Sequence, residues 1–79
     1  MKKLTLYGRP ACHLCQDMEL ELQRLAAEFE FELEVVDIDG DPALLERHGE
    51  QIPVLMGEGG EICHYFLDEV ALRRYLQPE

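Results

Sequence analysis

The chain of 79 residues lacks several features that define large classes of proteins. No apolar run approaches the roughly 20 residues that a helix needs to cross a bilayer. The opening segment MKKLTLYG has two lysines but too few apolar residues for a secretory signal peptide. Three cysteines are too few for a disulfide-rich secreted scaffold, and one of them must lack a partner within the chain. We therefore expect a cytoplasmic protein in which any disulfide is transient.

Basic residues are also scarce. Seven Lys and Arg residues stand against 17 Asp and Glu residues, which gives a formal net charge of −10. The phosphates of nucleic acids and of anionic membranes would be repelled by this charge, so we expect neither of them as a partner. The charge would suit a basic partner surface, although solubility alone is sufficient to explain it.

No internal repeat, low-complexity tract or linker divides the chain, so we expect one monomeric domain over residues 1–79. A chain of this length buries only about 60% of the surface that its unfolded form exposes. The apolar content of 47% is nevertheless ordinary for a globular protein and is sufficient for a compact core.

Two kinds of apolar periodicity predict the first elements. Leu4 and Leu6 alternate with polar residues and predict a strand over residues 3–7. Residues 31–35 alternate in the same way with glutamates, which is typical of a strand at the edge of a sheet. Between these strands, apolar residues recur at steps of three and four over residues 12–29, which predicts an amphipathic helix.

After the second strand the apolar pattern changes. Val36 and Ile38 shift its phase by one residue, which indicates either a bulge or a change of the buried face. A short helix follows over residues 41–49, since Asp41 is suited to cap its first amides and Gly49 to end it.

The C-terminal third predicts a hairpin and a helix. Residues 53–56 and 61–64 read as strands joined by a glycine-rich turn. Residues 68–76 read as a helix whose acidic start and basic end match its dipole. The predicted order is β-α-β-α-β-β-α, an α/β fold in which three helices cover a mixed, four-stranded sheet.

The most informative motif is Cys12-His13-Leu14-Cys15, which follows the first strand and opens the first helix. Residues three apart on a helix share a face, near the roughly 5.5–6 Å Cα separation that a disulfide prefers. Free amides and the helix dipole favour a thiolate at Cys12, where the pKa of a thiol can fall to about 3.5–7.5. Arg9 and a protonated His13 would act in the same direction. We interpret Cys12 as a nucleophile and Cys15 as the resolving thiol.

A metal site is the competing interpretation of this motif. It needs two more ligands, and Cys63 and His64 are the obvious candidates. Neighbours on a strand project to opposite faces, and zinc sites usually draw on two compact ligand pairs. We therefore predict thiol–disulfide chemistry and no metal ligand set.

Four further residues receive modest interpretations. We interpret Cys63 as a buried strand residue rather than a third redox thiol. His48 lies at a predicted helix end, where a cation suits the dipole, and receives no catalytic role. Tyr65 and Phe66 fit either a substrate groove or packing on the sheet, and the sequence does not separate these two roles.

The segments LTLYGRPACHLC, VVDIDGDPAL and IPVLMG resemble, in order and spacing, those of small glutaredoxin-like proteins of the thioredoxin-fold superfamily. The resemblance covers nearly the whole chain and implies a thioredoxin-like fold. It maps the family's nucleophile to Cys12 and its resolving cysteine to Cys15. It also implies that Pro53 is a cis proline facing the disulfide, although most X–Pro bonds are trans. Arg9 stands where glutaredoxins often carry a basic residue.

The chain departs from glutaredoxins where these proteins receive glutathione. Glutaredoxins commonly have Thr-Val-Pro, whereas this chain has Gln51-Ile52-Pro53. The family's Gly-Gly is replaced by bulky residues, Tyr65 and Phe66, and only Asp68 keeps an acid at the start of the last helix. We therefore expect little use of glutathione as a cofactor, and a reductant protein in its place.

The main functional hypothesis is a thiol–disulfide oxidoreductase that acts on a disulfide-containing protein or a small thiol substrate. Besides the two cysteines and the proline, the predicted site includes residues that tune the thiol or bind substrate: Arg9, His13, Ile52 and Asp68. The alternative is a non-enzymatic thioredoxin-fold module that binds a metal, an iron–sulfur cluster or a protein partner.

Overall fold

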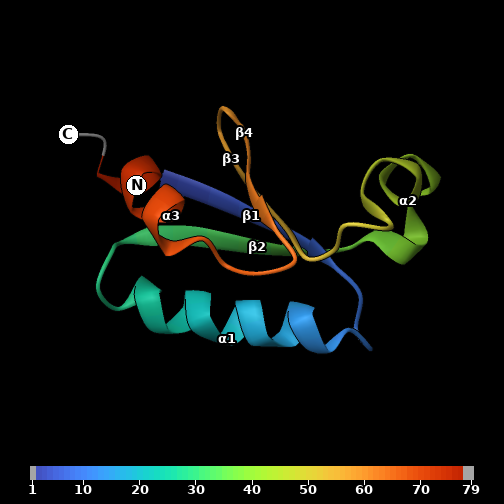
Figure 1. Cartoon of the computed structure of the whole chain (residues 1–79), viewed down its shortest axis with the longest axis horizontal. Helices are drawn as coiled ribbons and strands as arrows, with labels where there is room; N and C mark the ends of the chain where they lie inside the picture. The colour runs from blue at the N-terminus through green and yellow to red at the C-terminus, as the bar shows by residue number, and fades with distance from the viewer. Residues whose placement is uncertain (1, 78–79) are drawn as a thin grey trace.

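Strands and helices alternate along the chain in the predicted order (Figure 1). The structure is a computed structural model and describes residues 2–77, so residues 1, 78 and 79 of the predicted domain lie outside the described residues. The elements are β1 (Lys2–Gly8), α1 (His13–Ala26), β2 (Phe31–Asp37), a 3₁₀ turn η1 (Ile38–Gly40), α2 (Pro42–His48), β3 (Val54–Gly57), β4 (Gly60–His64) and α3 (Glu69–Leu76). The predicted β-α-β-α-β-β-α fold is confirmed.

The four strands form one mixed sheet in the order β2-β1-β3-β4. β1 pairs parallel with β2 and antiparallel with β3, and β3 and β4 form an antiparallel hairpin. β2 therefore lies at an edge, as its glutamate row predicted. The parallel ladder runs without interruption from Lys2 and Phe31 to Gly8 and Asp37, so the phase shift at Val36 is a change of buried face and not a bulge.

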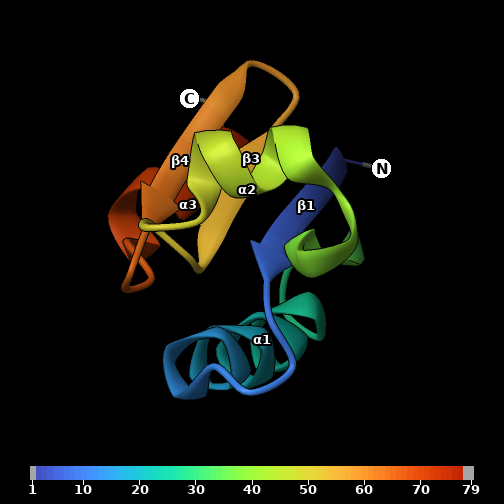
Figure 2. The same cartoon turned by 90° about the vertical axis from the view of Figure 1, so that its right-hand side faces the viewer.

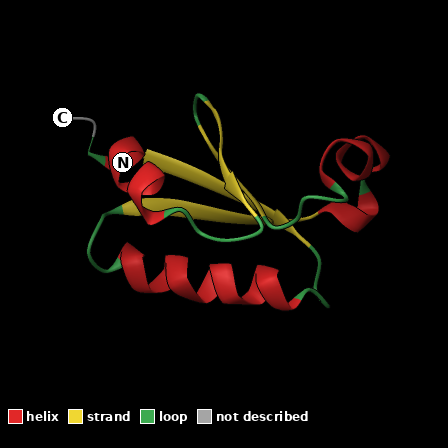
Figure 3. Cartoon of the chain, in the orientation of Figure 1, coloured by secondary structure: helices red, strands yellow, loops and turns green. Residues whose placement is uncertain are grey.

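The hydrophobic core lies between one face of the sheet and helices α1 and α3. In Figure 3, α1 runs below the sheet and α3 lies at its left end. Leu4 and Leu6 of β1 point to this face, where they meet Met18 and Leu22 of α1 and Leu72 of α3. The predicted apolar stripe of α1 is the face that is buried. Each fully buried leucine stabilises the fold by about 1.5–3 kcal/mol.

The opposite face of the sheet receives much less cover. α2 lies beyond the C-terminal end of β1, in front of the sheet in Figure 2. It contacts the sheet through His48, whose ring stacks on Tyr7 with centroids 5.0 Å apart and an interplanar angle of 17°. Seven residues of helix span only about 10 Å, so α2 covers one end of this face. His48 does lie in the last turn of its helix, but its side chain is buried.

None of the helices within residues 2–77 combines the length and the apolar character needed to span a bilayer.

Candidate functional site

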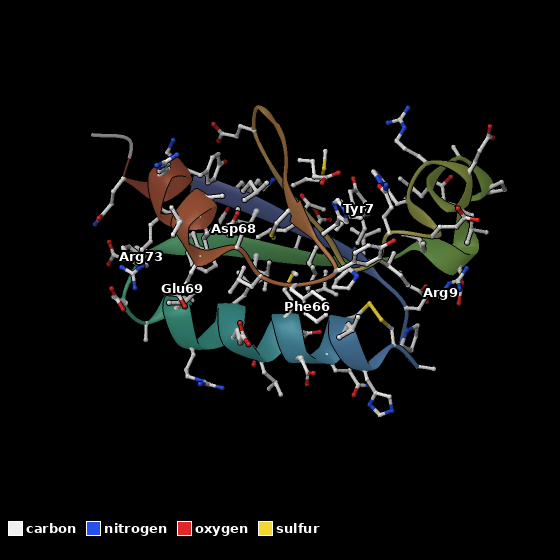
Figure 4. All side chains as sticks on the ribbon, in the orientation of Figure 1. Tyr7, Arg9, Phe66, Asp68, Glu69 and Arg73 are labelled. Atoms are coloured by element: carbon white, nitrogen blue, oxygen red, sulfur yellow. A yellow bond between two sulfur atoms is a disulfide. The ribbon has the colours of Figure 1, made fainter. Side chains whose placement is uncertain are left out.

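The two cysteines of the Cys-x-x-Cys motif form a disulfide at the start of α1, where Figure 4 shows the sulfur–sulfur bond. Their Cα atoms are 5.2 Å apart. Cys12 is the N-cap of α1, and its sulfur accepts a hydrogen bond from the backbone N–H of Cys15 at 3.2 Å. No acidic residue lies in the first turn. Once the disulfide is reduced, the amides and the helix dipole therefore favour a thiolate on Cys12.

The two sulfurs differ in accessibility. Cys12 is half-buried and borders an open cleft, whereas only 6% of Cys15 is exposed. Gly8 packs directly against Cys15, since a Cβ added to this glycine would lie 2.8 Å from the Cys15 sulfur. A substrate that enters the cleft therefore reaches Cys12 first.

The cleft beside Cys12 has a volume of about 410 Å³ and combines three segments that are distant in sequence. They are the β1–α1 loop, η1 and the loop between α2 and β3. The residues that line it are Arg9, Pro10, Ala11, Cys12, Asp39 and Ile52. The structure thus brings together three of the predicted site residues, Arg9, Cys12 and Ile52, and Pro53 directly follows Ile52 in the chain.

A second cleft of about 330 Å³ reaches Cys15 from the side of β2. Its wall includes Gly8, Gln16 and Val35, and it does not include Cys12. Of these two clefts, the accessible thiol therefore faces the first, which we name the Cys12 cleft.

The Ile52–Pro53 peptide bond is cis, the isomer that the resemblance implied. The side chain of Pro53 is buried, and its carbonyl accepts a hydrogen bond from the N–H of Tyr65 at 2.9 Å. Ile52 is half-buried. Among the backbone hydrogen bonds of the turns and loops in residues 2–77, none uses the N–H or the C=O of Ile52. Ile52 lines the Cys12 cleft, so its backbone groups are available to a ligand with an extended backbone.

Arg9 makes a contact that the sequence analysis did not anticipate. Its Nε lies 2.7 Å from Oδ1 of Asp39, across the same cleft. Asp39 is in turn held by its own N–H, which donates to Oδ1 of Asp37 at 2.9 Å. The expected influence of Arg9 on the thiolate is therefore balanced by a carboxylate in the same cleft.

Asp39 is the site residue that sequence reasoning missed, although a usable signal was present. The carboxyl ends of parallel strands meet at one edge of a sheet, and Arg9 and Asp39 closely follow the ends of β1 and β2. Opposite charges at such corresponding positions indicate an ion pair.

Besides Cys15 and Pro53, two further predicted site residues do not line the Cys12 cleft. His13 is the first residue of α1, is exposed, and is not among the residues that line the cleft. Asp68 is the N-cap of α3, where its carboxylate accepts the N–H of Ala71 at 3.0 Å. The structure therefore gives Asp68 a local role in starting a helix.

Cys63 lies on β4 and is buried, as expected from the sequence. Burial is the main cause that raises the pKa of this thiol; a hydrogen bond with the backbone of Asp68 opposes it, and the carboxylates of Asp68 and Glu61 add to the rise. Its neighbour His64 turns away from the core, with Nδ1 2.7 Å from Oε2 of Glu61. Within residues 2–77, no three or more His, Cys, Asp or Glu side chains are arranged to hold a metal ion.

Tyr65 and Phe66, whose roles the sequence left open, behave differently from one another. Tyr65 has a φ of 64°, in the left-handed region that favours glycine. Its hydroxyl donates to the carbonyl of Glu50 at 2.9 Å, so it ties the end of β4 to the loop that carries Ile52. Phe66 is 69% exposed and borders a small groove that is also lined by residues of α1. Figure 4 shows Phe66 above that helix.

Comparisons with known proteins agree with this geometry. A profile of the family described as "Glutaredoxin-like domain (DUF836)" matches residues 3–77. The solution NMR structure of protein Ne2328 from Nitrosomonas europaea is 42% identical, with a TM-score of 0.88 over 96% of this chain and 92% of that one.

Two more distant structures share the fold. The X-ray structure of target protein XcR50 from X. campestris is 37% identical with a TM-score of 0.69, over 96% of this chain and 97% of that one. Thioredoxin 1 from Thermosipho africanus is 22% identical with a TM-score of 0.65, over 96% of each chain, which shows a common fold alone. With the family profile spanning nearly all of its length, the chain belongs to the glutaredoxin-like domain family within the thioredoxin fold.

Proposed function

We propose that the protein is a thiol–disulfide oxidoreductase. The observation that carries this proposal is the asymmetry of the dithiol: Cys12 caps a helix and borders an open cleft, whereas Cys15 is buried one turn inward. Reactive cysteines are found at helix N-termini with partial exposure, because the thiolate is the nucleophile.

The reaction follows from the positions of the two sulfurs. The Cys12 thiolate attacks one sulfur of a substrate disulfide, and the other sulfur leaves as a thiolate and is protonated. The Cys15 thiolate then attacks the Cys12 sulfur of this mixed disulfide and releases the second substrate thiol. Two electrons pass to the substrate, and the Cys12–Cys15 disulfide remains until a reductant removes it. Such a cycle fits the cytoplasm, where reductants are available.

A disulfide within a protein or peptide is the substrate class that the cleft supports best. Ile52 lines the cleft, and its N–H and C=O, which no loop hydrogen bond within residues 2–77 uses, are available to pair with an extended backbone. The region in which glutaredoxins carry glycines for glutathione holds Tyr65 and Phe66 instead. We therefore propose a protein as the reductant, with weak or absent turnover by glutathione.

The test compares variants in which one of the two cysteines is replaced. Cys15→Ser should accumulate mixed disulfides with substrate proteins, because no thiol resolves them, whereas Cys12→Ser should form none. Both variants should be made in a Cys63→Ala background, which leaves one thiol in each. Selective alkylation of Cys15 in the reduced protein at neutral pH would reverse the assignment. Stoichiometric metal in anaerobically purified protein would instead favour a binding module.

A further inference from the structure

The Cys12 cleft carries one positive and one negative side chain, and the two are paired with each other. Among the residues that line it, Arg9 is the one basic residue and Asp39 the one acidic residue. Their Nε and Oδ1 atoms are 2.7 Å apart. Figure 4 places Arg9 at the same end of the molecule as the disulfide. The guanidinium is thus engaged before any substrate arrives.

Asp39 is held in this position by its own turn. Its N–H donates to the carboxylate of Asp37 at 2.9 Å, and the preceding residue, Ile38, is fully buried. The side chains of Arg9 and Asp39 keep exposed fractions of 41% and 54%, so a ligand in the cleft meets both charges. The carboxylate is therefore a fixed feature of the cleft wall.

Other basic residues of the described chain, residues 2–77, do not line the cleft. His13 faces solvent outside the cleft. Lys2 and Lys3 lie at the opposite end of β1, and a strand of seven residues spans about 20 Å. The remainder of the chain contributes to a formal net charge of −10. An anion entering the cleft therefore meets a guanidinium whose charge is already offset by the Asp39 carboxylate, while a cation is attracted by that carboxylate.

We propose that Asp39 is a specificity-determining residue that makes the Cys12 cleft prefer disulfides with cationic or neutral groups beside the sulfur over anionic ones. The substrate preference rests on the proposed oxidoreductase function, whereas the charge selection at the Cys12 thiol does not. The same arrangement gives a reason for weak use of glutathione, whose net charge at neutral pH is negative.

The first experiment measures substrate preference. Reduced protein is mixed with cystamine, which is cationic, with bis(2-hydroxyethyl) disulfide, which is neutral, and with glutathione disulfide, which is anionic. We expect second-order rate constants to fall in that order. Asp39→Asn should raise the ratio of the anionic to the neutral rate constant about threefold, the effect of a unit charge at roughly 7 Å in water.

A matched control separates this local effect from net charge. Glu32→Gln removes the same charge from an exposed position near the other end of the sheet, where its strand partner is Lys3. It should leave the ratio unchanged. Arg9→Gln should lower the ratio, in the direction opposite to Asp39→Asn. A ratio that responds equally to Asp39→Asn and Glu32→Gln would overturn the proposal.

The second experiment does not need enzyme activity. In the Cys15→Ser, Cys63→Ala background, Cys12 is alkylated with iodoacetate, which is anionic, or with iodoacetamide, which is neutral. Both reagents attack the same thiolate, so their rate ratio cancels any change in the thiolate fraction. Asp39→Asn should raise the ratio of the iodoacetate rate constant to the iodoacetamide rate constant about threefold.

The two experiments fail in different ways. If the alkylation ratio responds to Asp39→Asn but no disulfide is reduced, the proposed function is wrong and the charge selection stands. If disulfides are reduced but neither ratio changes, the oxidoreductase function stands and the role of Asp39 is refuted.

Discussion

At the scale of single residues, the position of Cys15 depends on the absence of a side chain at Gly8. An added Cβ would lie 2.8 Å from the sulfur and 3.0 Å from the Cβ of Cys15, so that Cys15 would have to move. We expect Gly8→Ala to lower the free energy of unfolding by about 1–3 kcal/mol and to slow closure of the Cys12–Cys15 disulfide. Urea unfolding and the rate of thiol loss under a mild oxidant measure these effects.

Gly59→Ala is the control for this substitution, because an added Cβ there has no heavy atom within 4 Å. It should leave disulfide closure unchanged. Equal closure rates in the two variants would show that Cys15 can shift freely, against the close packing described above.

Cys63 gives stability a dependence on pH. Burial raises the pKa of its thiol in the folded state above the ordinary value of 9.0. Between these two pKa values the unfolded chain has lost a proton that the folded chain retains, so stability falls as the pH rises. The contribution of the Cys63 thiol to stability is complete below about pH 9, and it is lost as the pH rises through the pKa of this thiol in the folded state.

We therefore predict that wild type loses stability relative to Cys63→Ala as the pH is raised from 7 to 10. Urea unfolding of the oxidised protein measures this, since Cys12 and Cys15 do not titrate when joined. A difference in unfolding free energy that stays constant over this range would contradict the assignment.

Residue-level prediction from the sequence succeeded where the signal was local. Cys12 and Cys15 carry their chemistry in a four-residue motif, and the structure places them as expected at a helix start. Asp39 was missed because its role depends on Arg9, 30 positions earlier in the chain, and on the register of two strands. Asp68 was assigned to the site because an acid before a helix has the same appearance whether it binds a ligand or caps the helix.

At the scale of elements, each α-helix starts at a side chain that accepts a hydrogen bond from its first turn. For α3 this residue is Asp68. Asp68→Ala should lower the free energy of unfolding by about 1 kcal/mol, because the N–H of Ala71 loses its acceptor, whereas Asp68→Asn should retain most of the stability. Urea unfolding of the three proteins provides the comparison.

The rate of Cys12 alkylation distinguishes this structural role from a functional one. It should be the same in both Asp68 variants, because Asp68 does not line the Cys12 cleft. A large loss of Cys12 reactivity without loss of stability would instead place Asp68 in the site, as the family resemblance implied.

The helices and strands were predictable because the spacing of apolar residues and the capping residues agree along most of the chain. Two details of these elements could not be predicted. The first helix ends at Ala26 rather than near Phe29, although Phe29 is still buried, because a turn carries it back with its N–H donating to the carbonyl of Leu25 at 2.8 Å. The 3₁₀ turn η1 depends on the Asp37 carboxylate and on burial of Ile38, and neither follows from periodicity.

At the scale of the whole molecule, the acidic residues are mostly without a cationic partner. Within residues 2–77 there are three ion pairs between arginine and a carboxylate, and His64 pairs with Glu61 when its imidazole is protonated. Two of the three share Arg73, which Figure 4 shows near Glu69. The molecule measures 36 × 23 × 19 Å. At an ionic strength of 0.01 M the Debye length is about 30 Å, so carboxylates repel one another across most of the fold, whereas at 0.15 M it is about 8 Å.

Salt should therefore stabilise this protein. Self-repulsion of an excess of like charges destabilises the compact state, and screening removes part of that cost. We expect the melting temperature to rise by several degrees between 0.01 and roughly 0.5 M NaCl, since about 1 kcal/mol corresponds to about 4–8 °C for a domain of this size. The double variant Glu30→Lys, Glu46→Lys alters two exposed positions, each replacement adding two positive charges, so the net charge changes from −10 to −6. Its melting temperature should be higher at low salt and should rise less with NaCl, and an equal rise in both proteins would mean that screening of net charge is not the cause.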